Sequence, residues 1–255
     1  MDLNLLEATA LERDMTQWVI LDARSPKAWQ EGHIPGAYSF SWEDYTKTDT
    51  AGIPYRILPP KELSNALGQL GIATDSAVLV YGDADTSWGG EGWLCWALAW
   101  LGHKGPVKLL NGGIQQWRHL GFPITTLQSA QPSPVTYEVT LHRKLNISAA
   151  ELAAQRNELV LIDTRSTMEW FLGHIPQAIH INWKDFFHGD DNRPLTADEL
   201  RQLLRKNNVP ENRRIVYYCT GGVRSGYTWM VHELAGLPTA INFEGGIEEW
   251  NRQQP

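Results

Sequence analysis

LDARSPKAWQEGHIPGAYSFSWEDY at residues 21–45 closely matches IDTRSTMEWFLGHIPQAIHINWKDF at residues 162–186. At a shift of 141 positions, an Asp-x-Arg triplet, a Gly-His-Ile-Pro quartet and two tryptophans coincide. Three further blocks repeat in the same order: residues 58–63 with 195–200, 78–81 with 215–218, and 112–117 with 245–250. A repeat kept in order over four blocks indicates a tandem duplication. The chain of 255 residues has room for two small domains.

The boundary between the two copies is expected in residues 127–134, LQSAQPSP, because this stretch is rich in Pro and Ser and has the composition of a linker. The sequence therefore predicts one domain over residues 1–127 and a second over residues 135–255.

Each copy has the pattern of an α/β domain. Short apolar runs that fit buried parallel strands occur at residues 18–21, 78–81, 159–162 and 215–218. Helices are expected between them. Two begin with capping boxes, Ser148-x-x-Glu151 and Thr196-x-x-Glu199, and further helices are expected near residues 93–101 and 227–235. Strands that alternate with helices predict a mostly parallel sheet flanked by helices in each copy. The twelve tryptophans are expected to fill the cores.

Composition excludes several classes of function. The net charge is −7 with no long basic run, which is a poor match to a nucleic-acid partner. The longest strongly apolar stretch, residues 93–101, is too short to cross a membrane, and the acidic N-terminus does not resemble a signal peptide. Two cysteines cannot build a disulfide framework. We therefore expect a cytoplasmic protein with free thiols.

The two copies differ in chemistry at one place. After the second strand, the second copy reads CTGGVRSG at residues 219–226, whereas the first reads GDADTSWGG at residues 82–90. The scaffold is shared, but the cysteine at this position occurs only in the second copy. This asymmetry indicates that Cys219 carries the function.

Cys219 lies where a strand ends and a loop leads into a helix, the place where α/β sheets bind ligands. Two glycines allow the loop to curl so that backbone N–H groups converge, and the helix N-terminus and Arg224 add positive charge. These features favour the thiolate form and predict an activated nucleophile. The alternative is an inert buried cysteine, which is the expectation for Cys95 within an apolar helix.

The motif Cys-x-x-Gly-x-Arg after a strand resembles the active-site loop of the rhodanese sulfurtransferases. Asp-x-Arg followed by Gly-His-Ile-Pro, and Gly-Gly-x-x-x-Trp near each domain end, extend the resemblance over nearly the whole chain. It implies two tandem rhodanese-like domains, with a Cys219 that cycles through a persulfide in the second and no catalysis in the first. Gly82 at the cysteine position, with Asp83 and Asp85 nearby, agrees with a catalytically silent first domain.

Substrate is expected at the Cys219 loop and at the strand ends that converge beside it in this architecture. The candidate substrate-binding residues are the remaining loop positions and one strand-end arginine: Thr220, Gly221, Gly222, Val223, Arg224, Ser225 and Arg165. Four residues separate Cys219 from Arg224, whereas phosphatases with a related loop have five. The shorter loop is expected to surround a single sulfur atom rather than a phosphate.

Arg224 favours a small dianion such as thiosulfate as the sulfur donor. The mercaptopyruvate-specific branch of the family has Thr where this loop has Arg224, and an arginine at the position of Glu169. Both departures count against mercaptopyruvate, although Glu169 also removes an arginine that binds the donor in some thiosulfate enzymes.

We therefore expect a monomeric thiosulfate sulfurtransferase that transfers sulfur from a small anionic donor to a thiol or cyanide. No metal or organic cofactor is expected. The alternatives are a mercaptopyruvate sulfurtransferase, a cysteine-based phosphatase, and a rhodanese-like module that binds a partner without catalysis.

Overall fold

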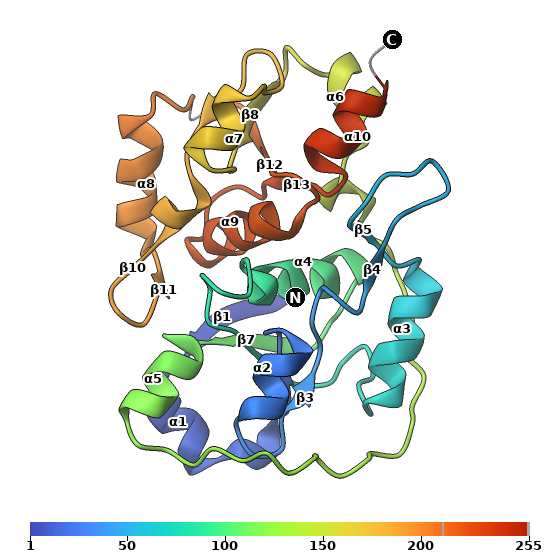
Figure 1. The fold of residues 1–255 in the computed structure, drawn as a ribbon, viewed down its shortest axis with the longest axis vertical. Helices are drawn as coiled ribbons and strands as arrows, with labels where there is room; N and C mark the ends of the chain where they lie inside the picture. Colours follow the sequence, from blue (N-terminus) through green and yellow to red (C-terminus); the bar gives the residue numbers. More distant parts are fainter. Residues whose placement is uncertain (211, 254–255) are drawn as a thin grey trace.

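Two parallel sheets reproduce the repeat seen in the sequence (Figure 1). The computed structural model describes residues 1–210 and 212–253. The first sheet has the order β1 (Asp2–Leu6), β7 (Pro106–Leu110), β6 (Val78–Tyr81), β2 (Val19–Asp22) and β3 (Tyr38–Ser39). The second has the order β13 (Ile241–Phe243), β12 (Arg214–Tyr218), β8 (Leu159–Asp163) and β9 (Ile179–His180). All neighbours are parallel, so the predicted fold class is confirmed.

The helices also correspond between the two units. In the first unit they are α1 (Ala8–Arg13), α2 (Pro26–Glu31), α3 (Pro60–Gln69), α4 (Gly90–Leu101) and α5 (Gly113–His119). In the second they are α6 (Ala149–Ala154), α7 (Thr167–Phe171), α8 (Ala197–Lys206), α9 (Val223–Leu234) and α10 (Gly246–Gln253). Both predicted capping boxes are present. Helices α4 and α9 begin several residues earlier than expected, because Gly89 and Gly222 turn the chain in the left-handed region directly before them.

Each unit also carries one short two-stranded hairpin. Strands β4 (Thr46–Lys47) and β5 (Arg56–Ile57) pair in the first unit, and β10 (Phe187–His188) and β11 (Arg193–Pro194) pair in the second. Three 3₁₀ turns complete the described elements: η1 (Met15–Gln17), η2 (Arg143–Leu145) and η3 (Trp183–Phe186). No helix among the described residues is long and apolar enough to span a membrane.

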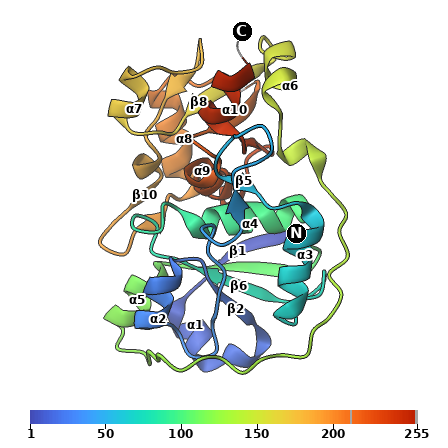
Figure 2. The same cartoon turned by 45° about the vertical axis from the view of Figure 1, so that its right-hand side comes forward.

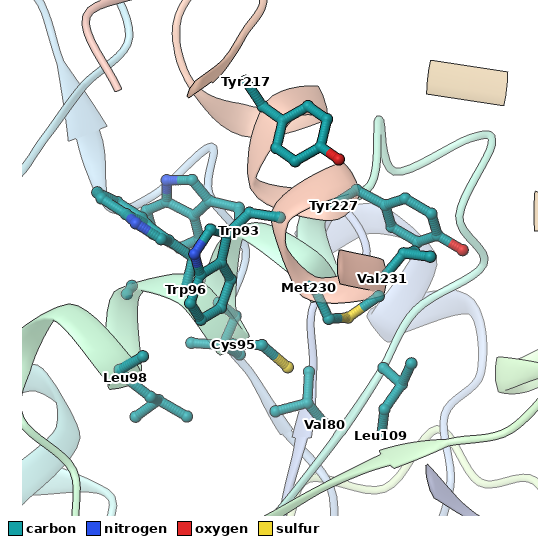
Figure 3. Close-up of a cluster of buried hydrophobic side chains, with 14 of the residues drawn as sticks. Val80, Trp93, Cys95, Trp96, Leu98, Leu109, Tyr217, Tyr227, Met230 and Val231 are labelled. Atoms are coloured by element: carbon teal, nitrogen blue, oxygen red, sulfur yellow. The ribbon is translucent and has the colours of Figure 1, made fainter. Parts of the chain in front are cut away.

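Helices α4 and α9 pack against each other and join the two units (Figures 1 and 2). Their backbones approach closely because glycines face them. A Cβ on Gly226 would lie 2.8 Å from the Cα of Trp93, and a Cβ on Gly92 would overlap the backbone of Tyr227. Figure 3 shows the core between them, where Cys95 lies near Met230. The two units therefore share one hydrophobic core, and the start of α9 is fixed against the first unit.

The predicted linker runs as an extended segment over the first unit and then up toward the second (Figure 2). The Tyr38 hydroxyl donates to the Ala130 carbonyl at 2.8 Å, and the Ser129 hydroxyl donates to the Ala37 carbonyl at 2.9 Å. Between α5 and η2 the described chain forms no helix and only one isolated β-bridge, at Thr125. The domain boundaries at residues 127 and 135 remain a prediction.

Candidate active site

Cys219 directly follows β12, and the loop after it leads into α9. Gly222 makes the turn with a φ of +80°, where a Cβ would also lie 2.6 Å from the carbonyl oxygen of Glu244, so only glycine fits there. The Cys219 carbonyl accepts a hydrogen bond from the Ile247 amide at 2.9 Å. The loop is therefore held between the end of β12 and the start of α10.

The Cys219 side chain lies deep in the loop, with only 2% of the residue exposed. The Ser225 Oγ is 3.5 Å from its Sγ and 2.7 Å from the Asn242 Oδ1, so the hydroxyl proton can be donated to either acceptor. Asn242 in turn donates to the Gly222 carbonyl at 3.1 Å. This network holds the Ser225 hydroxyl beside the Cys219 sulfur.

Arg224, predicted as a substrate-binding cation, makes a bidentate ion pair. Its Nη1 and Nη2 each donate to one Glu169 carboxylate oxygen at 2.7 Å. Nη2 also donates to the Thr220 hydroxyl at 2.7 Å, and that hydroxyl donates to Glu169 at 3.0 Å. Three side chains thus form a closed charge-assisted network at the edge of the loop.

This network holds both charged groups in their ionised forms. Burial opposes the charge on Glu169, but hydrogen bonds from Arg224 and Ser166 outweigh it and hold the pKa of the carboxyl well below its usual range. Burial likewise opposes the charge on Arg224, but the hydrogen bonds to Glu169, the interaction with Cys219 and the negative charge of Glu169 raise its pKa. Arg224 is therefore a permanent cation with a permanent counter-ion.

A cavity of about 380 Å³ opens above the loop. Five of its lining residues belong to the predicted loop or to the loop cysteine itself: Cys219, Thr220, Gly221, Val223 and Arg224. The others are Glu169 and three aromatic residues of the first unit, Trp42, Tyr55 and Trp88. The first unit has no cysteine at the position that corresponds to Cys219, but it builds one wall of this cavity.

Sequence analysis missed these three aromatic residues. Tyr55 packs on the loop so closely that a Cβ on Gly221 would lie 2.5 Å from its Cβ. The Trp88 ring covers the Arg224 guanidinium at 5.6 Å, a cation–π contact. Tryptophans were expected in the core, but Trp88 is 52% exposed. No motif marks these positions, because they meet Cys219 only through the packing of the two units.

Not every predicted residue lines the cavity. Gly222 forms the turn, and Ser225 contacts the sulfur from the first turn of α9. Arg165 is bound to Asp163 at 2.7 Å and to the Gly173 carbonyl at 2.7 Å. The first unit repeats this arrangement with Arg24, Asp22 and Gly32, which favours a structural role for Arg165. Its predicted role in substrate binding is untested.

Cys95 lies on α4 in the core between the two units and is fully buried (Figure 3). Burial, with a smaller contribution from the charge of Glu91, raises the pKa of its thiol far above the usual range. A thiol that stays protonated is a poor nucleophile. The environment of Cys95 thus agrees with the expected inert role.

In the first unit, a carboxyl group fills the position of the missing cysteine. The Glu91 side chain occupies the space that a Cβ on Gly82 would need. It accepts a hydrogen bond from the Ala84 amide at 2.8 Å and another from the Ser87 hydroxyl at 3.2 Å. Burial, followed by the charge of Asp83, raises the pKa of Glu91 to about 7. The Glu91 carboxyl therefore fills the space inside the loop of the first unit that corresponds to the Cys219 loop.

We expect Glu91→Gln to make stability less dependent on pH. The folded-state pKa of Glu91, about 7, lies above the ordinary glutamate value of 4.5, so the stability that this group contributes is fully present below pH 4.5 and is lost as the pH rises through 7. Glutamine does not ionise in this pH range, so the variant should not lose this stability as the pH rises. Between pH 5 and pH 8, the unfolding free energy of the variant should gain ~1–3 kcal/mol relative to wild type. Urea unfolding at both pH values measures this, and a pH-independent difference would contradict it.

Among the described residues, no group of three or more His, Cys, Asp or Glu side chains could hold a metal ion. The side chains at the site are a thiol that lines an aromatic-walled cavity, a neighbouring hydroxyl, and a paired cation and carboxylate.

Comparison with known proteins shows to which family the chain belongs. The model of the rhodanese-like domain matches residues 7–120 and again residues 148–253. The chain belongs to the rhodanese-like family. The first match covers the first sheet except β1 and the second match covers the second sheet, so the tandem rhodanese-like arrangement is confirmed.

Relatives of this rhodanese-like chain align over most of their length. It is 29% identical to the sulfur carrier protein TtuD of Thermus thermophilus, over 92% of both chains. It is 32% identical to a probable 3-mercaptopyruvate sulfurtransferase of Pseudomonas aeruginosa, over 88% of this chain and 83% of the relative. It is 26% identical to the thiosulfate sulfurtransferase of Rattus norvegicus, over 90% and 80%.

Solved structures share the fold. An anaerobic ergothioneine biosynthesis enzyme from Chlorobium limicola superposes with a TM-score of 0.87 at 21% identity, over 99% of this rhodanese-like chain and 69% of the enzyme. At this identity the likeness shows only that the two-unit architecture is shared.

Proposed function

We propose that the protein is a rhodanese-type sulfurtransferase in which Cys219 carries the sulfur as a persulfide. The observation that carries this proposal is the position of the Cys219 thiol, at the bottom of the cavity between the two units. Relatives named as thiosulfate and mercaptopyruvate sulfurtransferases align with nearly the whole chain and support the same chemistry.

The proposed reaction has two half-reactions. The Cys219 thiolate attacks the outer sulfur of the donor, a new S–S bond forms, and the leaving group departs with the electron pair of the broken bond. With thiosulfate the leaving group is sulfite. A thiolate or cyanide then attacks the outer sulfur of the persulfide and regenerates Cys219. Neither half-reaction requires a metal or an organic cofactor.

Ser225 and Arg224 are the residues placed to assist. The Ser225 hydroxyl, 3.5 Å from Sγ, can donate to a thiolate while Asn242 keeps it oriented. Arg224 lines the cavity beside the loop, where its guanidinium is paired with the Glu169 carboxylate. We propose thiosulfate, or a related anion that carries a sulfane sulfur, as the donor. Mercaptopyruvate is the second candidate, since one relative is named for it.

We also propose that the chain works as a cytoplasmic monomer. Its two units complete the cavity within one chain, and both cysteines are free thiols, as is usual in a reducing compartment.

Intact mass spectrometry tests the proposed function. Incubation with thiosulfate should add the mass of one sulfur atom to the peptide that contains Cys219, and cyanide should remove it as thiocyanate. An adduct on Cys95 alone would contradict the assignment. Hydrolysis of an aryl phosphate without thiocyanate formation would favour the phosphatase, and neither activity would favour a binding module.

A further inference from the structure

The cation that an anionic donor would need is already bound within the cavity. Glu169 engages both Nη atoms of Arg224 at 2.7 Å, and Thr220 accepts a further hydrogen bond from Nη2. Arg224 is 8% exposed, and the Trp88 ring covers its guanidinium. A second anion that approaches Arg224 therefore meets a guanidinium whose charge Glu169 already neutralises, so the pair as a whole offers it no net positive charge.

Glu169 is not needed to form the helix on which it lies. It closes a capping box with Ser166 at the start of α7. In the first unit the corresponding residue is Ala28, and Ser25 still caps α2 by accepting from the Ala28 amide at 3.2 Å. The duplicated helix thus forms without a glutamate. The carboxylate is a feature of the catalytic copy, where it reaches Arg224.

The opposite wall of the cavity is aromatic and partly open to solvent. Tyr55 is 43% and Trp88 52% exposed, so neither side chain is a core residue. Both lie in the left-handed region, with φ of +62° and +58°, a conformation that residues with a bulky side chain rarely adopt. Residues in such strained conformations cluster at active sites and at ligand-binding surfaces. Trp42 lies edge-on to Tyr55 at 6.2 Å and completes the wall.

We propose that Glu169 determines donor specificity, so that this cavity prefers organic thiosulfonates, which carry one negative charge and a flat apolar group, over the inorganic thiosulfate dianion. The proposal rests on the sulfurtransferase function and specifies its substrate class. Because Glu169 neutralises Arg224, the pair does not compensate the second charge of thiosulfate, whereas an aryl group can pack against Tyr55 and Trp88.

The chemical step is the same for both donors. The Cys219 thiolate attacks the terminal sulfur of R–SO₂–S⁻ and forms the Sγ–S bond. The bond between that sulfur and the sulfonyl sulfur breaks, and its electron pair leaves with the sulfinate R–SO₂⁻. The persulfide keeps the single negative charge that the thiolate had, so no oxidant, reductant or proton is required.

The test compares benzenethiosulfonate with thiosulfate as donor, using cyanide as acceptor and the full chain. Wild type should have a kcat/KM for benzenethiosulfonate ~10-fold or more above that for thiosulfate. Glu169→Gln frees the charge of Arg224 and keeps a residue that fits the capping box. It should raise kcat/KM for thiosulfate ~10-fold and change that for benzenethiosulfonate less than ~3-fold.

Trp88→Ala tests the aromatic wall independently. It should lower kcat/KM for benzenethiosulfonate ~10-fold more than it lowers the value for thiosulfate. Glu199→Gln is the matched control, because Glu199 closes the same kind of capping box on α8 but does not line the cavity. It should leave the ratio between the two donors unchanged.

Two results would overturn the inference: a wild type that prefers thiosulfate, or a Glu169→Gln variant in which both donors change by the same factor. If neither donor adds sulfur to Cys219, the proposed sulfurtransferase function itself fails. Mass spectrometry of the protein after incubation with each donor distinguishes a failure of the donor preference from a failure of the sulfurtransferase function.

Discussion

Cys219→Ser should abolish sulfur transfer while the protein stays folded. A hydroxyl is close to a thiol in size, so the side chain should fit the same buried position beside Ser225. Serine cannot carry a transferable sulfane sulfur, and no second thiol lines the cavity. Thiocyanate formation from thiosulfate and cyanide should fall below ~0.1% of the wild-type rate. Thermal unfolding should show a transition close to that of wild type.

Cys95→Ser is the matched control for this experiment. Cys95 is fully buried in the core between the units, away from the cavity, so its replacement should leave sulfur transfer largely unchanged. A Cys219→Ser variant that keeps wild-type activity would refute the persulfide mechanism. Loss of activity only in Cys95→Ser would reverse the assigned roles of the two cysteines.

Arg224→Ala should have the second largest effect. It removes a cation that contributes to the ionised state of Glu169 and leaves that carboxylate unpaired at the edge of the cavity. The negative charge of the Cys219 thiolate and the charge that builds up on the departing group then meet repulsion from this unpaired carboxylate. We expect kcat/KM with thiosulfate to fall roughly 10–1,000-fold, which is ~1.4–4 kcal/mol of transition-state stabilisation.

Two further variants separate the charge of Arg224 from its shape. Arg224→Lys keeps the charge but cannot bridge both oxygens of Glu169, so its loss should be smaller than that of alanine. In the Arg224→Ala background, Glu169→Gln should recover part of the activity because it removes the unpaired carboxylate. Strictly additive effects in this double-mutant cycle would mean that the ion pair does not link the two residues functionally.

Local patterns predicted much of the fold and part of the site. The apolar run at residues 78–81 became β6, and the capping boxes at Ser148 and Thr196 begin α6 and α8 as expected. These features depend on neighbouring residues, so sequence suffices to find them. The position of the Cys219 loop before α9 was predictable for the same reason.

The partner of Arg224 was not predictable in this way. Sequence analysis treated Arg224 as a cation available to a donor and Glu169 as the absence of an arginine. In the structure these residues, 55 positions apart, form a bidentate pair. No periodicity relates them, because α7 and the loop meet only after β8 and β12 have paired in the sheet.

The sequence by itself determined that the chain is a duplicated α/β protein with one distinctive cysteine, because repeats, strand runs and helix caps are local and leave their pattern in the order of residues. Only the tertiary structure decided what surrounds that cysteine. The packing of α4 on α9, through Gly92 and Gly226, brings the aromatic wall of the first unit over the second unit's loop. Contacts between distant segments depend on how buried surfaces fit together, and that fit exists only in the folded molecule.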